Sequence, residues 1–316
     1  MRIDATKVRP QGRTFSFFGR VATVLPTIRR TIASGVLAAG LAGAGAISTA
    51  AAQSGDAARG EYLAKAGGCL GCHTEPRQGA TPYAGGRELK TPFGTFYGPN
   101  ITPHPAQGLG RWTEADFRRA MREGVRPDGA HYFPAFPYTS FTKITDSDAG
   151  HLWAYLKSLP PSDRPSRPHD LSFPFNIRLL VWFWKFMNFT PGPFRPDASK
   201  PAAINRGAYL VEALGHCGEC HTPRDFLGGL KSTALAGAAV GPGGGKIPNL
   251  TPTGLGQWAD ADLKEFLTSG MTPEGDVAGG EMAEVIRNST SQLVTDDMAA
   301  LVAYLRTVPP QPAPGR

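Results

Sequence analysis

Two short stretches of this chain combine cysteine and histidine at a spacing that supports one specific chemistry. Both read Cys-x-x-Cys-His, and their residues are Cys69, Cys72 and His73, then Cys217, Cys220 and His221. On one helical turn, both thiols can reach the vinyl edge of a porphyrin while the histidine lies beneath its iron. The pattern therefore predicts two covalently attached c-type haems, with His73 and His221 as the proximal iron ligands.

Other uses of four cysteines fit this spacing less well. A zinc site built from two Cys-x-x-Cys pairs places them roughly 15–20 residues apart, whereas these pairs lie in opposite halves of the chain. A thioredoxin-like dithiol needs no histidine after its second cysteine, and a disulfide framework is typical of short secreted domains. The haem interpretation uses every cysteine and leaves no thiol for a structural disulfide.

Residues 1–52 have the composition of an export signal. An Ala/Gly-rich apolar run from Ile32 to Ile47 is followed by the small residues Ala50–Ala52, which form a cleavage context. The basic region before the run contains Arg2, Lys7, Arg9, Arg13, Arg20, Arg29 and Arg30. We expect export to the periplasm by the general secretory route, because haem is attached to the unfolded chain after export. A twin-arginine signal and an uncleaved membrane anchor are the alternatives.

The charge of the exported protein differs from that of the whole chain. The formal charge of the chain is +7. Removal of residues 1–52 takes away seven basic residues and one acidic residue, which leaves 26 basic and 25 acidic residues. Four haem propionates would make the protein roughly neutral or slightly acidic. The composition therefore gives no reason to expect a nucleic-acid partner.

The chain after the signal contains an internal repeat. Each half reads as a helix with the haem motif, a long Gly/Pro-rich loop, a short helix, a ligand loop and a terminal helix. This order predicts an all-α, loop-rich fold in which a haem supplies the apolar centre of each small module. The matched segments are Gly60–Leu63 with Gly207–Leu210, Pro99–Pro103 with Pro248–Pro252, Gly110–Trp112 with Gly256–Trp258, and Asp116–Gly124 with Asp262–Gly270.

The repeat divides the exported chain into a first domain at 53–162, a Pro/aromatic-rich linker at 163–199 and a second domain at 200–316. The linker holds an aromatic run, Phe173–Phe189, that is too short and too charged to span a membrane. We expect it to form a helix that packs between the modules and covers the haem edges. The alternative is a docking surface for a partner or for the membrane interface.

The two halves differ at the position expected for the sixth iron ligand. Carrying the offset between the halves forward takes Phe136 to Met282, which lies in a glycine-rich stretch after the short helix. Met282 is therefore the predicted axial ligand of the second haem, whereas phenylalanine cannot bind iron. Candidates for the first haem are His131 and then His104, while Met121 is expected in the core. A five-coordinate or water-bound first haem stays open.

With these residues in place, the chain resembles the dihaem cytochromes c related to cytochrome subunits of membrane-bound alcohol, gluconate and aldehyde dehydrogenases. The resemblance rests on both haem motifs, the paired Pro-Asn-Ile/Leu-Thr-Pro segments, the Gly-Arg-Trp and Gly-Gln-Trp turns, and the Gly-Gly-Glu-Met stretch. It implies two tandem class I cytochrome c domains, each wrapped around a covalent haem. Such subunits often carry three haems and often have methionine where this chain has Phe136.

The resemblance also implies partners. The electron donor would be the catalytic subunit of a periplasmic dehydrogenase, and the acceptor would be quinone, a quinone oxidase or another cytochrome. The leading hypothesis is thus an electron relay that is not an enzyme by itself. The alternative is a haem enzyme, similar to a thiosulfate dehydrogenase or a peroxidase, that uses an open or unusually ligated first haem. A sensor would need a signalling domain, for which the sequence gives no sign.

Overall fold

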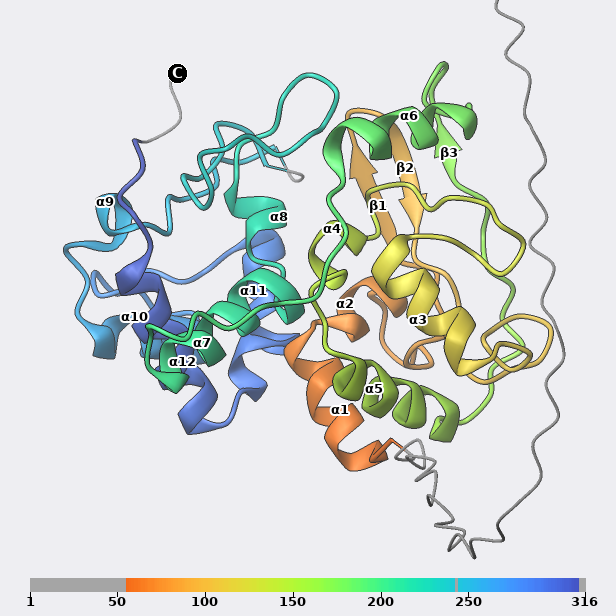
Figure 1. Ribbon diagram of the computed structural model, residues 1–316, viewed down its shortest axis with the longest axis horizontal. Coiled ribbons are helices and arrows are strands. Elements are labelled where there is room, and N and C mark those ends of the chain that lie inside the picture. Colours follow the sequence, from red (N-terminus) through yellow and green to blue (C-terminus); the bar gives the residue numbers. More distant parts are fainter. Residues whose placement is uncertain (1–54, 242–243, 313–316) are drawn as a thin grey trace, which may run out of the picture. The chain divides into compact units, whose positions relative to one another are not determined.

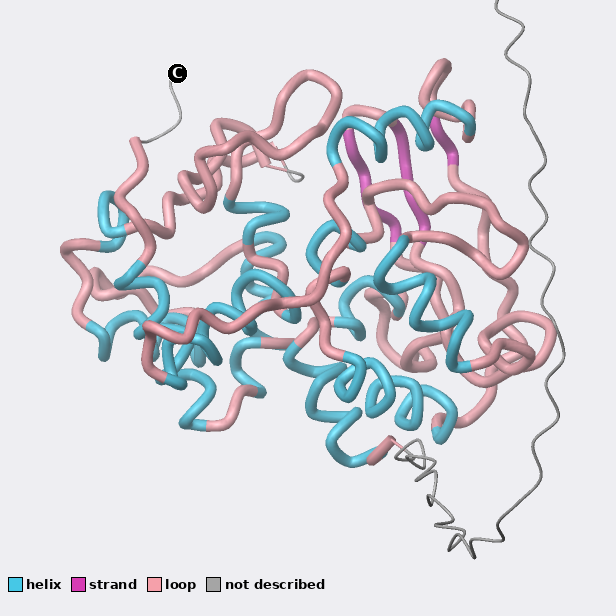
Figure 2. Tube along the Cα trace, viewed as in Figure 1, coloured by secondary structure: helices cyan, strands magenta, loops and turns pink. Residues whose placement is uncertain are grey.

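The computed structural model describes residues 55–241 and 244–312 (Figure 1). The export signal predicted at residues 1–52 lies outside the described residues. Long loops connect short helices through most of the chain, as Figure 2 shows. The expectation of a helix-rich, loop-rich fold is therefore confirmed.

The helices follow the order expected from the repeat. The first half contains α1 (Ala57–Ala66), α2 (Cys69–His73), α3 (Glu114–Glu123), α4 (Tyr138–Phe141) and α5 (Asp146–Ser158). The linker contributes α6 (Leu179–Asn188). The second half contains α7 (Ala202–Tyr209), a π-helical turn (Leu210–Leu214), α8 (Gly218–His221), α9 (Pro252–Leu255), α10 (Asp260–Ser269), α11 (Gly280–Asn288), a 3-10 turn (Thr290–Gln292) and α12 (Thr295–Thr307).

The first and last helices of each half cross at very close range. Helix α1 packs against α5, and α7 packs against α12 (Figure 1). A Cβ atom on Gly60 would lie 1.9 Å from the carbonyl oxygen of His151, and one on Gly207 would lie 2.0 Å from that of Ala300. Glycine is therefore needed in both places so that the two backbones can meet. The repeated Gly-x-Tyr-Leu segment marks this helix crossing.

A matched pair of hydrogen bonds joins the two halves. The Tyr62 hydroxyl donates to Asp297 Oδ2 at 2.5 Å, and the Tyr209 hydroxyl donates to Asp148 Oδ2 at 2.6 Å. Each tyrosine lies in the first helix of one half, and each aspartate lies in the first turn of the other half's last helix. The halves thus contact each other reciprocally, as the two copies in a twofold interface do.

The π-helical turn accommodates one extra residue in the second half. Cys217 lies ten positions after Gly207, whereas Cys69 lies nine positions after Gly60. The amide of Gly215 donates to the carbonyl of Leu210 at 2.7 Å, five residues back, and this bond inserts the extra residue without breaking the helix. The haem motif that follows keeps its place relative to the helix crossing.

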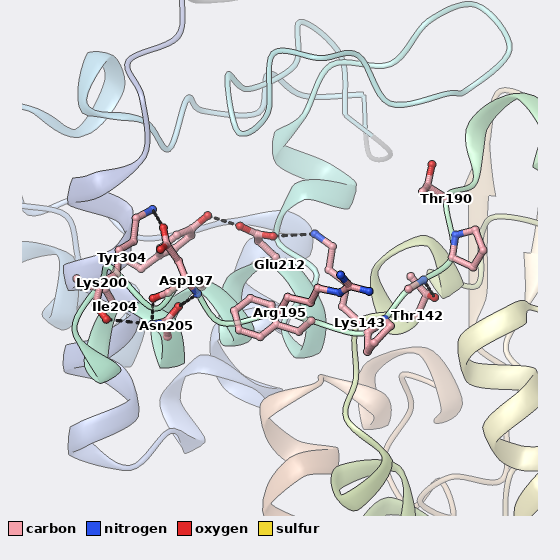
Figure 3. Close-up of a pocket in the computed structure, with 15 residues that line it drawn as sticks. Thr142, Lys143, Thr190, Arg195, Asp197, Lys200, Ile204, Asn205, Glu212 and Tyr304 are labelled. Atoms are coloured by element: carbon pink, nitrogen blue, oxygen red, sulfur yellow. Dashed lines mark hydrogen bonds and ion pairs between the residues drawn. The ribbon is translucent and has the colours of Figure 1, made fainter.

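The π turn also presents Glu212 to its neighbours (Figure 3). Its Oε2 atom accepts a bond from Lys143 Nζ at 2.7 Å, and its Oε1 atom accepts one from the Tyr304 hydroxyl. These contacts fasten the turn to a loop of the first half and to α12. Charged and hydrogen-bonding partners thus hold the π turn on both sides.

One hydrophobic cluster includes residues from both halves. Leu63 of α1, Leu214 of the π turn and Leu301 of α12 are all buried members of it. Ala52–Arg316 accordingly groups as a single unit. The boundaries at 162, 199 and 200 stay predictions, because a shared core does not test them.

The all-α prediction is wrong in one respect, because the first half carries a small antiparallel sheet. Its strands are β1 (Glu88–Thr91), β2 (Gly94–Tyr97) and β3 (Asp170–Leu171), in that order. Gly94 pairs with both Thr91 and Leu171, so β2 is the central strand. The sequence gives little warning of this sheet, since the strands have two to four residues and β3 comes from the linker.

The linker begins as a strap along the first half. The amide of Tyr97 donates to His169 Nδ1 at 3.1 Å, beside the β2–β3 pairing. Two ion pairs, Arg164 with Glu75 and Arg167 with Glu88, lie along the same segment. The linker is thus an integral part of the first half up to β3.

Helix α6 confirms the predicted helix in the aromatic run but packs with its polar residue inward. Val181 and Lys185 are buried, the latter 9% exposed, and the Lys185 ammonium donates to the carbonyl of Glu123. Trp182 and Phe186 point away from the protein, and Phe186 is 80% exposed. The predicted cover of the haem edges by this run stays a prediction. Within the described residues, no helix has the length and apolar character needed to cross a membrane.

The helix crossing leads to a stability prediction. Changing Gly207 to alanine places a Cβ against the Ala300 carbonyl and should destabilise the protein by about 2 kcal/mol, despite alanine's higher helix propensity. Denaturant unfolding of the haem-loaded protein measures this. Gly245→Ala is the control, because nothing lies within 4 Å of a Cβ there. Equal stability of the two variants would contradict the close-contact argument.

Candidate functional site

Each haem motif forms a single short helical turn, as predicted. Helix α2 consists of the first motif, and α8 begins one residue after Cys217 and ends at His221. The first cysteine of each pair is half-buried and the second is exposed. The two thiols and the imidazole of each motif therefore come from one turn, which is the arrangement needed for covalent attachment and iron ligation.

A backbone carbonyl fixes the ring of each motif histidine. The Nδ1 atom of His73 lies 2.8 Å from the carbonyl oxygen of Pro99, and that of His221 lies 2.8 Å from the carbonyl oxygen of Pro248. A carbonyl only accepts, so Nδ1 carries the proton and Nε2 keeps a free lone pair. Burial lowers the pKa of both histidines, which favours this neutral form. The neutral imidazole is the form that binds iron.

The proline carbonyls are themselves held by a side-chain network. Asn100 Oδ1 accepts bonds from the Thr102 amide at 2.9 Å and the Thr102 hydroxyl at 2.7 Å. Asn100 Nδ2 donates to the carbonyl of Ser162, just after α5, at 2.8 Å. The same contacts occur in the second half among Asn249, Thr251 and Gln311. The repeated Pro-Asn-x-Thr-Pro segment thus ties the histidine partner to the end of each terminal helix.

The surroundings of the cysteines favour protonated thiols, although the second cysteine of each pair keeps an exposed surface. Burial raises the pKa of Cys69 and of Cys217 to about 12 and raises that of Cys72 and Cys220 as well. All four are unpaired by disulfides in the described chain. Such thiols are poor thiolate nucleophiles, so a thioredoxin-like role is disfavoured. Two protonated thiols beside a free imidazole nitrogen form the donor set that fits a haem c, one set in each half.

Met282 lies in the first turn of α11 and not in the loop we expected. Its side chain is half-buried. The neighbouring carboxylate of Glu281 lies close enough to Cys220 to raise the pKa of that thiol further, although burial is the main cause. Among the haem-motif helices, the described contact of α11 is with α2 of the first motif. The ligand role itself stays a prediction.

Phe136 occupies the matched position in the first half as part of an aromatic group. Its ring centroid lies 5.2 Å from that of Tyr132 and 5.7 Å from that of Phe141, both in edge-to-face geometry. Phe136 packs against the main hydrophobic cluster. Aromatic packing stabilises this segment where a methionine would offer a sulfur.

His131, the leading substitute ligand, contacts the linker helix. Its Nδ1 atom lies 3.0 Å from Lys185 Nζ. An ammonium only donates, so Nδ1 accepts and the proton of the neutral ring lies on Nε2. Burial lowers the pKa of His131, and the charge of Lys185 lowers it further. In this geometry neither ring nitrogen offers a free lone pair, so iron ligation by His131 requires that the contact with Lys185 be given up.

The other two candidates have structural roles. His104 Nδ1 accepts bonds from the amides of Ala106 and Gln107, so it closes a turn. Met121 is 7% exposed and belongs to the core, as we expected from its alignment with Leu267. Neither side chain is placed as a ready substitute for methionine as the axial ligand of the first haem.

A polar cleft of about 360 Å³ lies apart from the haem motifs (Figure 3). Its wall includes Lys143, Arg195, Lys200 and Glu212, and none of the motif residues lines it. Lys143 pairs with Glu212, and Lys200 pairs with Asp197. The cleft is thus a charged surface feature and not the cofactor site.

Sequence reasoning missed several groups around the motifs. The carbonyls of Pro99 and Pro248 orient the histidines, and the repeated segment around them was the available signal. Lys185 inside the aromatic run and Glu219 inside the second motif gave no such signal, because their partners lie far away in the sequence.

Comparison with known proteins agrees with this geometry. The Cytochrome c family model matches residues 57–160. The diheme cytochrome c-type protein of Cereibacter sphaeroides is 48% identical to this chain over 264 residues, which cover 81% of this chain and 86% of that protein.

Two further relatives are named as parts of dehydrogenases. The fructose dehydrogenase cytochrome subunit of Gluconobacter japonicus is 42% identical over 264 residues, which cover 82% of this chain and 54% of that subunit. The cytochrome c subunit of alcohol dehydrogenase (quinone) of Gluconobacter oxydans is 40% identical over 267 residues, with 80% and 55% covered. The chain thus spans little more than half the length of these two subunits. Together with the motif geometry, these matches show that the chain belongs to the cytochrome c family, which binds haem c covalently, alongside dihaem cytochromes and the cytochrome c subunits of dehydrogenases.

Proposed function

We propose that this protein is a dihaem cytochrome c that relays single electrons from a periplasmic dehydrogenase to the respiratory chain. One observation carries the proposal: both halves present two thiols on one helical turn and a histidine whose Nδ1 is held by a proline carbonyl 2.8 Å away. Two tandem class I cytochrome c domains, each with a haem c, account for this repetition.

The residues that would hold the haems come directly from the motifs. Cys69, Cys72 and His73 serve the first, and Cys217, Cys220, His221 and Met282 serve the second. A bound haem c supplies reversible one-electron chemistry. The chain's own contribution is to orient the imidazoles, to keep their Nε2 atoms unprotonated and to surround the sites with buried apolar side chains.

The difference between the distal sides sets a direction for the electrons. A methionine sulfur stabilises reduced haem iron and raises the reduction potential. Met282 would therefore make the second site the better electron acceptor, while Phe136 offers the first site no such ligand. We expect electrons to enter at the first half and leave from the second.

The partners follow from the relatives. The names of the fructose and alcohol dehydrogenase subunits support a dehydrogenase catalytic subunit as the donor. The word quinone in the latter name supports quinone, a quinone oxidase or a further cytochrome as the acceptor. A periplasmic location with an export signal at residues 1–52 fits such a role.

A second function is favoured by the first half alone. Phe136 stands at the ligand position, and His131 contacts Lys185. A first haem with an open distal face could bind a small molecule and act as a peroxidase-like or thiosulfate dehydrogenase-like centre. Since the four cysteines belong to the motifs, a thiosulfate dehydrogenase with a cysteine thiolate ligand is disfavoured.

The relay predicts two separate one-electron steps. In a redox titration of the haem-loaded protein, Met282→Leu should lower the upper midpoint potential, by on the order of 0.1 V, and leave the lower one in place. Met121→Leu is the matched control, because it removes a core methionine of the first half. If Met282→Leu shifts the lower of the two midpoint potentials instead, the methionine-ligated haem is the one at which electrons enter, and the proposed direction is wrong.

The distal side of the first haem can be read from its spin state. We expect a high-spin ferric EPR signal from about half of the iron and CO binding to a matching share of the reduced protein. Two low-spin signals without CO binding would contradict the open face. They would identify a replacement ligand such as His131 and leave only the relay.

A further inference from the structure

Helix α11, which carries Met282, belongs to the second half but contacts the first haem motif. Its second-half neighbour is α10, but it also packs against α2, the first motif. The Ser289 hydroxyl, just after α11, donates to the carbonyl of Ala66 at 2.8 Å in a buried contact. The Asn288 amide lies 3.6 Å from the place where a Cβ of Gly71 would be. The ligand helix of the second half therefore rests on the first motif.

An ion pair connects this helix to the first half. Arg87 Nη1 lies 2.8 Å from Glu284 Oε1, with side chains 17% and 29% exposed. Glu284 follows Met282 by two residues in α11. Helix α11 itself contacts α2, the helical turn of the first motif. The pair thus lies directly beside the first motif.

The backbone around Arg87 is fixed to the first motif. The amide of Gly85 donates to the carbonyl of His73 at 2.7 Å, and the amide of Gly98 donates to the carbonyl of Arg87 at 2.9 Å. Arg87 is therefore held by the same loop that presents Pro99 to His73. The ion pair of Arg87 with Glu284 therefore connects this loop to α11.

A second contact connects the second haem motif to the first half. Glu219, in the middle of the second motif, accepts bonds from the Thr139 hydroxyl at 2.5 Å and the Ser140 hydroxyl at 2.8 Å. Both hydroxyls belong to α4, which directly follows Phe136 and Pro137. The side chain of Glu219 is 10% exposed and also pairs with Arg224 at 2.6 Å. The second motif thus anchors α4 and, through it, the chain around Phe136.

We propose that each haem motif and its adjoining loop position the sixth-ligand segment of the other half, so that the ligation of each iron depends on both halves. These segments are the part of α11 around Met282 and the chain from Phe136 into α4. Arg87 is the positioning residue for Met282 through Glu284, and Glu219 is the positioning residue for the segment that follows Phe136. This arrangement couples the two reduction potentials through protein contacts. The inference rests on the proposed function, in which Met282 binds the second iron.

The Arg87→Glu variant tests this in the full-length, haem-loaded protein. Two carboxylates would then face each other beside α11. The near-infrared charge-transfer band of methionine-ligated ferric haem should disappear at a lower urea concentration than in the wild type. The equilibrium constant for the sulfur–iron bond obtained from this titration should be roughly tenfold smaller. The upper midpoint potential should fall with it. The double variant Arg87→Glu/Glu284→Arg should restore both the band and the upper midpoint potential. If charge reversal prevents haem loading, the nearly isosteric Glu284→Gln removes the same ion pair and should weaken the band in the same direction.

The controls separate this inference from the proposed function. Lys65→Gln breaks an exposed ion pair with Glu61 in the first half and should change neither readout. A wild-type band in Arg87→Glu, or a double variant as weak as the single one, would overturn the positioning role. A band absent from the wild type, or one that survives Met282→Leu, would instead refute Met282 as the ligand.

Glu219 provides the reciprocal test. Glu219→Ala removes the acceptor for the two α4 hydroxyls, and the EPR signal and CO affinity of the first haem should change while the methionine band remains. Glu219→Gln keeps an acceptor oxygen and should have the smaller effect. Mass measurement confirms that both haems are attached. An unchanged first-haem spectrum in Glu219→Ala would overturn this half of the coupling.

Discussion

The bond from each motif histidine to a proline carbonyl is the contact on which the rest of the arrangement depends. It determines which ring nitrogen carries the proton, and so whether the other can bind iron. The distance is 2.8 Å in both halves. The Asn–Thr network and the chain after each terminal helix keep Pro99 and Pro248 in place. The long loops are therefore working parts of the site, although they contain little regular secondary structure.

The second organising feature is reciprocity between the halves. Tyr62 bonds to Asp297, and Tyr209 bonds to Asp148, through buried or half-buried contacts. The same exchange continues nearer the motifs, where the partners are no longer matched in sequence. One ion pair reaches α11 from the first half, and one carboxylate of the second motif reaches α4. These contacts are the physical basis of the coupling proposed above between the two haem motifs.

The linker shows how a connecting segment can become part of a module. Its β3 strand completes the small sheet, and Lys185 brings an ammonium group to His131 and the carbonyl of Glu123. The burial of Lys185 lowers its pKa, which reflects the cost of removing a charge from water. The same rotation of α6 leaves Phe186 and Trp182 facing outward. The segment thus contributes contacts to the first half while keeping an apolar surface.

The sequence alone determined the chemistry of the site and the order of the helices. Cys-x-x-Cys-His is a local pattern in which all three reactive groups lie on one helical turn, so its geometry needs no distant partner. The repeat likewise located the glycine of each helix crossing and the proline that orients each histidine, although not their roles. Met282 was selected by its offset from Phe136, and its role as an axial ligand stays a prediction.

Tertiary structure decided what depends on residues far apart in the chain. The contact of His131 with Lys185 spans the linker, and the pairs Arg87–Glu284 and Thr139–Glu219 connect opposite halves. Strand β3 is too short to have a period of its own and exists because β2 offers a free edge. Such contacts are specified by packing and charge in three dimensions, and a pattern along one dimension carries no trace of them. The physical reason is that local spacing fixes which groups one helix turn can present, while only folding fixes which groups meet.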